Sequence, residues 1–152
     1  MVKKMSLSMV VIGVLCLFCA SFVRAEAREW CKSATLPNGD VVLDMKGDWD
    51  VLIHGYGYAD SIKDIKDVLT IKQEGDRFSA CIRKGINWWP SGSETIKGVV
   101  NKDGFKQVLM FTEAEGGGGA MSWERCLWEI VDNGKTVALD CGGMWEVNFT
   151  RK

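Results

Sequence analysis

The strongest constraint on the fold of this chain is a regular alternation of apolar and polar residues that begins at Gly47. A period of two is typical of half-buried β-strands, because successive side chains of a strand point to opposite faces. Gly, Asn and Asp residues separate eight such runs, and none of the runs has the period of a long helix. The runs are Gly47–Tyr56, Asp67–Gln73, Arg77–Lys84, Ser93–Val100, Phe105–Thr112, Met121–Val131, Lys135–Cys141 and Met144–Arg151.

Eight consecutive strands with one apolar face each predict an all-β fold, an eight-stranded antiparallel up-and-down barrel. Closure into a barrel removes the exposed edges that an open sheet would leave. The interior of such a barrel holds either side chains or one small ligand. A sandwich of two sheets is the alternative architecture for the same pattern.

The hairpin around Asn133 and Gly134 predicts its own register. A two-residue Asn-Gly turn is a strong hairpin signal and determines which residues oppose each other. The pairs on one face are Ile130 with Val137, Trp128 with Leu139, and Cys126 with Cys141. The other face carries a largely polar set of Arg125, Leu127, Glu129, Thr136, Ala138 and Asp140. A slip of one residue would exchange the two faces, so the pattern favours this register alone.

The first 25 residues have the order of a secretory signal peptide. Lys3 and Lys4 give a positive start, an apolar run extends from Met9 to Val23, and small residues around Ala25 offer a cleavage site. An uncleaved anchor is the alternative, but a periplasmic or secreted protein fits the pattern better. The expected parts are a cleavable signal peptide helix at 1–25, an N-terminal extension at 26–46 and a barrel domain at 47–152.

The charge of the chain argues against a nucleic-acid partner. Loss of Lys3, Lys4 and Arg24 with the signal peptide lowers the basic residues from 19 to 16 against 20 acidic ones, a net charge of −4. The basic residues are also scattered, and the isoelectric point of about 5.9 is far from the basic range of nucleic-acid-binding domains. We therefore expect no nucleic-acid binding, and no membrane association once the signal peptide is removed.

Four cysteines follow the signal peptide, an even number that predicts disulfides in an oxidising compartment. Alternation places Cys126 and Cys141 on the inner face and Cys81 on the outer face. We expect a Cys126–Cys141 disulfide between neighbouring strands and a Cys31–Cys81 disulfide that tethers the N-terminal extension. Cys31–Cys141 with Cys81–Cys126 is the alternative. No Cys-x-x-Cys pair is present and the single histidine, His54, is remote from the cysteines in sequence, so we expect no metal and no cofactor.

The lengths of the connections predict where a ligand would bind. In a meander alternate connections lie at the same end, and the long ones group together: Tyr56 to Lys66, Gly85 to Gly92, and Glu113 to Ala120. Loops that cluster at one end of a barrel commonly form its binding mouth. The aromatic candidates there are Tyr56, Tyr58, Trp88 and Trp89. The alternative interpretation is that Trp88 and Trp89 only cover the core of the barrel.

A Gly47-Asp48-Trp49 motif opens the first strand, and Arg151 follows the last apolar alternation. With the eight-strand meander, this pattern resembles the lipocalin-like barrels of the calycin group, which also includes avidins and fatty-acid-binding proteins. The resemblance implies that Trp49 plugs the closed end of the barrel and that Arg151 packs over it, both in structural roles. The Thr-Asp-Tyr-like motif of true lipocalins and the biotin-contacting residues of avidins have no counterpart in this sequence.

Enzyme chemistry has little support in the sequence. His54 points outward in the alternation of its strand and has no nucleophile motif beside it, so we expect a surface histidine and no enzyme activity. The leading hypothesis is an exported lipocalin-like protein that binds a small apolar or aromatic molecule at the long-loop end. The alternative is an exported protein-interaction module with a solid core, such as an enzyme inhibitor or an envelope assembly factor.

Overall fold

The computed structural model of the chain describes residues 30–56, 63–113, 119–142 and 145–152, and the fold of these residues is all-β. The strands are β1 (Lys32–Thr35), β2 (Val41–Asp44), β3 (Gly47–Gly55), β4 (Ile65–Glu74), β5 (Arg77–Ile82), β6 (Gly85–Ile86), β7 (Trp89–Pro90), β8 (Glu94–Val100), β9 (Phe105–Glu113), β10 (Met121–Arg125), β11 (Leu127–Val131), β12 (Thr136–Asp140) and β13 (Trp145–Arg151). The predicted signal peptide lies outside the described residues. No helix within the described ranges is long and apolar enough to cross a membrane.

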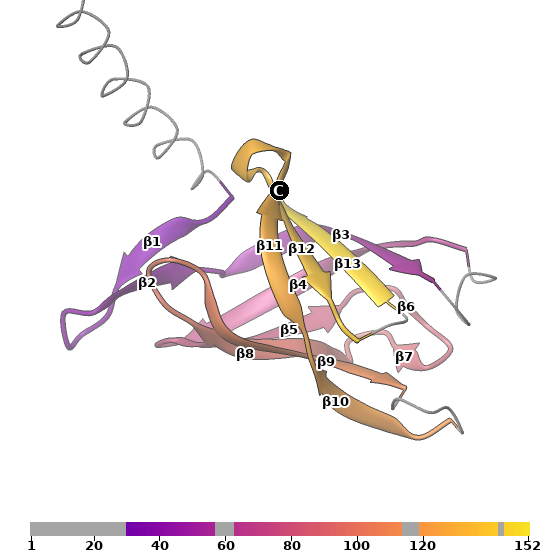
Figure 1. Cartoon of the computed structure of the whole chain (residues 1–152). Helices are drawn as coiled ribbons and strands as arrows, with labels where there is room; N and C mark the ends of the chain where they lie inside the picture. Colours follow the sequence, from indigo (N-terminus) through magenta and orange to yellow (C-terminus); the bar gives the residue numbers. More distant parts are fainter. Residues whose placement is uncertain (1–29, 57–62, 114–118, 143–144) are drawn as a thin grey trace, which may run out of the picture.

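One antiparallel sheet of nine strands is nearly closed into a barrel (Figure 1). The strand order is β10-β9-β8-β5-β4-β3-β13-β12-β11, so β3 pairs with both β4 and β13. This order confirms the predicted antiparallel up-and-down barrel, with nine strands in place of the expected eight. β6 and β7 form a separate small hairpin, and β1 pairs with β2 in another.

The additional strand arises because the run from 121 to 131 divides at Cys126 into β10 and β11. β10 pairs with β9, whereas β11 pairs with β12 on the other side. The backbone N–H of Cys126 donates a hydrogen bond to the carbonyl of Val108 on β9 at 2.9 Å. After this residue the chain leaves β9 and pairs with β12. β10 and β11 are therefore the two ends of the strand order, and we call the gap in strand pairing between β9–β10 and β11–β12 the seam. It is the one interruption in the order of paired barrel strands that the described residues form.

The predicted register of the β11–β12 hairpin is confirmed. Trp128 lies opposite Leu139, and the next pair along, Ile130, lies opposite Val137. Asn133 and the following Gly134 have φ angles of 55° and 85°, the left-handed values that the predicted turn requires. A Cys126–Cys141 disulfide extends the same series of pairs beyond the hydrogen-bonded strands, as expected.

Aromatic side chains fill the end of the barrel that the tight turns close. Trp49 is fully buried, and its ring centroid lies 5.6 Å from that of Phe149 and 6.2 Å from that of Trp30. Phe105 joins this cluster at 5.7 Å from Trp30. The guanidinium carbon of Arg151 lies 5.5 Å from the centre of the Trp49 ring. Arg151 thus packs over the ring of the buried Trp49 at the closed end of the barrel.

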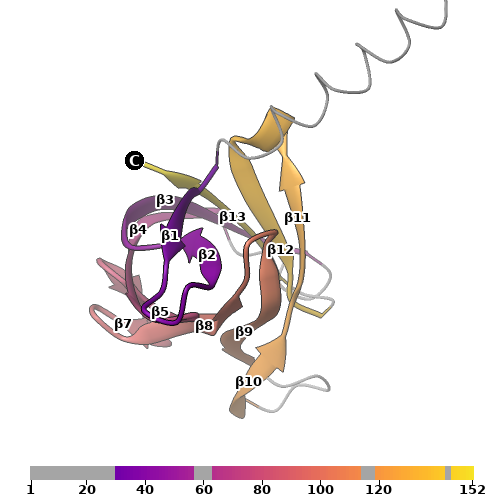
Figure 2. The same cartoon turned by 90° about the vertical axis from the view of Figure 1, so that its left-hand side faces the viewer.

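The β1–β2 hairpin covers this closed end (Figure 2). Trp30 and Met45, which flank the hairpin, are buried in the same core as the barrel side chains. The backbone N–H of Leu43 donates to the carbonyl of Asn101 at 2.9 Å, and that of Met45 donates to Oε1 of Gln73 at 2.7 Å. Packing and hydrogen bonds therefore attach the extension to the barrel.

The predicted Cys31–Cys81 disulfide is wrong, because both residues are free thiols. Cys31 is buried near the hairpin, where its Sγ donates to the carbonyl of Asp44 at 2.8 Å. Cys81 points to the outer face of β5 between the fully buried Ala80 and Ile82, so the wall separates the two sulfurs. Strand alternation locates Cys81 correctly, but it says nothing about the path of the segment that carries Cys31. Burial also raises the pKa of the Cys31 thiol to about 12.

The part of the seam nearer the closed end is filled by Trp128. The ring of Trp128 lies 5.4 Å from that of Phe105, and its Nε1 donates to the Phe105 carbonyl at 3.0 Å. Gly104 allows this approach, because a Cβ at that position would lie 1.9 Å from the Trp128 ring. An indole thus takes the place of ladder hydrogen bonds between β11 and β9.

Candidate functional site

The four predicted ligand aromatics do not form one cluster. Trp88 and Trp89 lie beside Trp145 at the long-loop end, with ring centroids 6.2 to 6.4 Å apart. Tyr56 comes directly after β3 and continues its outward-facing positions. Its hydroxyl donates a hydrogen bond to the Asp140 carboxylate of β12 at 3.0 Å. Tyr58 lies outside the described residues. The structure therefore brings two of the four side chains together and sends a third to the outer wall.

Trp89 belongs to the core of the barrel. Its side chain is 1% exposed, and its Nε1 donates to the carbonyl of Phe111 at 2.8 Å. Trp88 is 38% exposed and packs edge to face against Trp89. The pair covers the long-loop end, so Trp89 has little surface left for a ligand.

A short hairpin of β6 and β7 carries these tryptophans, where the sequence predicted an irregular connection. The carboxylate of Asp67 anchors the hairpin by accepting hydrogen bonds from the backbone N–H groups of Lys84 and Gly85 at 2.9 to 3.1 Å. Gly85 has a φ of 80°, and a Cβ there would lie 2.3 Å from the Trp89 carbonyl. Asp67 and Gly85 therefore hold the tryptophan cover in place.

Tyr56 lines a hollow of about 480 Å³ on the outer wall, over β11, β12 and β13. We call this hollow the outer groove. Its lining includes Tyr56, Leu127, Glu129, Ala138, Asp140 and Glu146. Strand positions rather than loops supply most of these residues, so the shape of the groove is fixed by the sheet.

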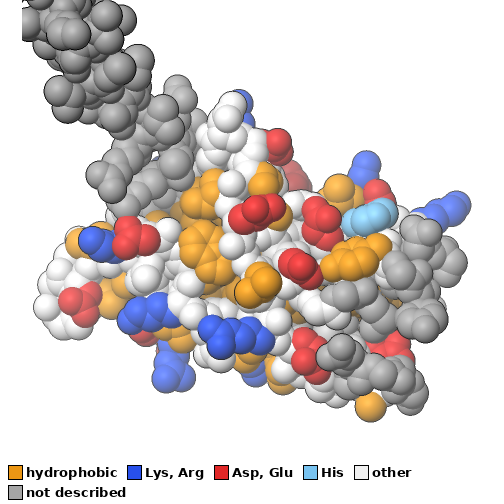
Figure 3. Space-filling view, in the orientation of Figure 1, with side chains coloured by type: hydrophobic (Ala, Val, Ile, Leu, Met, Phe, Trp, Pro, Cys, Tyr) orange, Lys and Arg blue, Asp and Glu red, His pale blue; other side chains and the backbone are white. Residues whose placement is uncertain are grey.

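The outer groove combines one exposed apolar side chain with negative charge. Leu127 is 71% exposed, and the charged residues of the lining are Glu129, Asp140 and Glu146, with no Lys or Arg among the described lining residues. Figure 3 shows carboxylate and apolar side chains interleaved over this face of the barrel. A single exposed apolar side chain is common on protein surfaces, so the hollow around Leu127 and its acidic lining are what distinguish this position.

His54 lies on the outer face of β3, opposite Glu146 of β13. Its Nδ1 and Oδ1 of Asp64 are 2.6 Å apart, and both side chains are about half exposed. The outward position matches the prediction from alternation. In the described part of the chain, no group of three or more His, Cys, Asp or Glu residues is arranged to hold a metal ion.

Side chains fill the centre of the barrel. Met110, Leu139, Val147 and Phe149 come from strands around the wall and are fully or almost fully buried. Two further hollows, of about 550 Å³ and about 210 Å³, lie over the outer side of β3 and β13 and at the seam, respectively. A container for an apolar molecule needs the central space that these side chains occupy.

Sequence reasoning missed Leu127 and Trp145 as site residues. Leu127 left a signal, because it is the large apolar residue on the polar face of the β11–β12 hairpin. Trp145 left none. Its place beside Trp88 and Trp89 depends on the pairing of β13 with β3, which joins segments at opposite ends of the barrel sequence.

Comparisons of the chain with protein-family models, with curated proteins and with solved structures found no match.

Proposed function

We propose that this chain is an exported lipocalin-like protein that works as a protein-interaction module and binds an apolar, basic segment of a partner protein in the outer groove. One observation carries the proposal: Leu127, 71% exposed, stands in a hollow whose charged lining residues are all acidic. A partner that covers Leu127 gains roughly 1–2 kcal/mol from apolar burial. Cationic side chains of the same segment would match the carboxylates and would accelerate association.

The construction of the outer groove supports a binding role. Its floor is formed by β11, β12 and β13, which are joined by backbone hydrogen bonds. The Cys126–Cys141 disulfide also links the start of β11 to the end of β12. The Tyr56 hydroxyl donates to Oδ1 of Asp140 at 3.0 Å, which orients both side chains before a partner arrives. A preorganised surface loses less conformational entropy on binding.

The filled interior favours this module over a container for a small apolar or aromatic molecule. At the long-loop end, the buried side chains of Trp89 and Trp145 pack against each other rather than around a central space. The Cys126–Cys141 disulfide supports export, because such bonds persist in the periplasm or outside the cell. We therefore propose that the protein works in one of these two compartments.

The proposal can be tested with a fluorescent decapeptide of alternating lysine and leucine, whose binding is followed by fluorescence anisotropy. An analogue with glutamate in place of lysine should not bind, because its charge has the same sign as the groove. Glu129→Lys should weaken binding of the lysine peptide roughly tenfold, since attraction becomes repulsion. Leu127→Ser should weaken it through the loss of apolar contact.

Glu74→Lys is the matched control, because it makes the same change in net charge at an exposed position at the end of β4. We expect it to leave the affinity of the lysine peptide within about twofold of the original value. Equal losses in the Glu74→Lys and Glu129→Lys variants would show that the peptide responds only to net charge. That result would overturn the assignment of the outer groove.

A further inference from the structure

The part of the seam nearer the long loops is a separate hollow of about 210 Å³. It lies between β10 and the end of β12, and among the described residues no strand pairs with both of them there. The lining includes Thr112, Glu113, Glu124, Arg125, Cys141 and Trp145, and we call it the seam pocket. None of these residues lines the outer groove.

Thr112 supplies the first sign that the seam pocket receives a ligand. Its side chain is 3% exposed, and its Oγ1 has no hydrogen-bond partner in the described part of the chain. Thr112 lies two residues beyond the fully buried Met110 on β9, so both side chains face the inside of the wall. A buried hydroxyl without a partner costs roughly 1–3 kcal/mol. A ligand with a polar group in the pocket would remove that cost.

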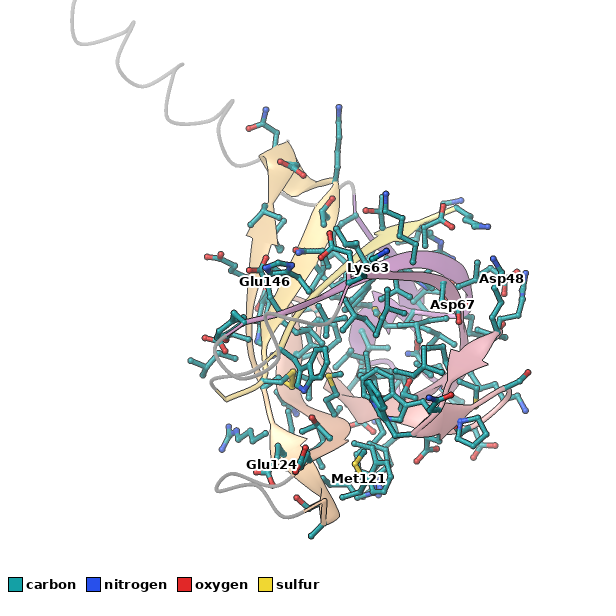
Figure 4. All side chains as sticks on the ribbon, turned by 90° about the vertical axis from the view of Figure 1, so that its right-hand side faces the viewer. Asp48, Lys63, Asp67, Met121, Glu124 and Glu146 are labelled. Carbon is teal, nitrogen blue, oxygen red and sulfur yellow. A yellow bond between two sulfur atoms is a disulfide. The ribbon has the colours of Figure 1, made fainter. Side chains whose placement is uncertain are left out.

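Glu124 supplies a negative charge on the same inner face. It pairs with Met110 across β9 and β10, and Ser122, its neighbour on that face, pairs with Thr112. The Ser122 hydroxyl donates to Oε1 of Glu124, which leaves the second carboxylate oxygen for a ligand. Figure 4 shows Glu124 on β10, well apart from Glu146 of the outer groove.

Trp145 supplies an aromatic wall. Trp145 lines the seam pocket, and its ring packs at a tilt against the rings of Trp88 and Trp89. An indole beside a carboxylate is the combination that proteins use to hold organic cations, through the negative face of the ring and direct ion pairing. Glu113 and Glu124 against Arg125 also leave the lining with a net charge of −1.

We propose that the seam pocket binds a small organic ammonium ion. Glu124 pairs with the ammonium group, Thr112 contributes its hydroxyl oxygen as an acceptor, and Trp145 packs against the carbon chain. Arg125 weakens the site through repulsion. This binding is independent of the partner segment proposed for the outer groove, because the two hollows have no lining residue in common.

Phenethylammonium chloride is a suitable probe, with uncharged 2-phenylethanol as a control of nearly the same shape. Titration into ¹⁵N-labelled protein should shift the indole N–H signal of Trp145 and the amide signal of Thr112. The alcohol should bind roughly tenfold more weakly or not at all. Equal binding of the amine and the alcohol would overturn the proposal.

Charge variants give effects of opposite sign. Glu124→Gln should weaken phenethylammonium binding roughly tenfold, whereas Arg125→Gln should strengthen it. Glu129→Gln removes the same charge from the outer groove and should leave the affinity within about twofold. A loss as large in Glu129→Gln as in Glu124→Gln would assign the effect to net charge and overturn the site. The lysine peptide distinguishes the two proposals, since its binding should respond to Glu129 and not to Glu124.

Thr112→Val separates binding from folding. Valine keeps the shape of threonine and removes the hydroxyl that lacks a partner, so the thermal stability of the free protein should be unchanged or higher. Phenethylammonium binding should weaken severalfold because the acceptor is lost. Unchanged amine affinity in a stable Thr112→Val variant would contradict the role of Thr112.

Discussion

Removal of the Cys126–Cys141 disulfide should lower the free energy of unfolding by about 3 kcal/mol. The two cysteines are 15 residues apart in sequence, and a cross-link that closes a loop of this size restricts the unfolded chain by about that amount. For a domain of this length the loss corresponds to a fall in melting temperature of about 12 °C. Urea denaturation of the Cys126→Ala, Cys141→Ala double variant, beside the parent protein, measures the difference.

Cys81→Ser is the matched control, because Cys81 is a free, half-buried thiol and its replacement should cost less than about 1 kcal/mol. A reductant should lower the stability of the parent to that of the double variant and should leave the double variant unchanged. Among the four cysteines that follow residue 25, peptide mapping without reduction should show one bridge and two free thiols. Cys31 should react more slowly than Cys81, because burial raises the pKa of the Cys31 thiol to about 12. Equal stability of the parent and the double variant would refute the reasoning, as would a bridge between Cys31 and Cys81.

Three further perturbations have expected outcomes. Gly104→Ala should lower the free energy of unfolding in urea by about 1–3 kcal/mol, because its Cβ would overlap the Trp128 ring; unchanged stability would contradict the packing at the seam. Gly85→Ala should be destabilising in the same assay, through its positive φ and the nearby Trp89 carbonyl. A hydrogen bond from the Arg83 guanidinium lowers the pKa of Asp48. The stability that this bond contributes is therefore present above the carboxyl pKa of the unfolded chain and is lost as the pH falls through the lower pKa of the folded state. Arg83→Gln should raise the pKa of Asp48 in an NMR titration.

Local sequence patterns predicted the parts of the fold that local physics determines. Alternation identified the barrel strands and the outward position of His54. The Asn133-Gly134 turn gave the register of β11 and β12, and with it the Cys126–Cys141 disulfide. These features depend on side-chain direction within one strand or across one tight turn, and both can be read from neighbouring residues.

Features that depend on distant segments were missed. The run from 121 to 131 was expected to be one strand, yet it divides at Cys126 because its halves pair with different strands. The alternation changes phase there: the apolar residues before the break are Met121 and Trp123, and those after it include Cys126, Trp128 and Ile130, at positions of the other parity. Residues 30–45 have too few strand positions to indicate that Trp30 and Met45 complete the barrel core. The seam pocket is a consequence of the same division at Cys126, so sequence alternation alone does not reveal it. Trp145 became a site residue only through the pairing of its strand with β3.

Recognition on the outside of a packed barrel is tested most directly by mapping the bound lysine–leucine peptide with NMR. The peptide should shift the backbone amide signals of Leu127, Glu129 and Asp140, which belong to the outer groove. The indole N–H signal of Trp89, buried and hydrogen-bonded at the long-loop end, should stay unchanged. Shifts centred on the indoles of Trp89 and Trp145, with none in the outer groove, would contradict a protein-interaction module that binds through its outer wall.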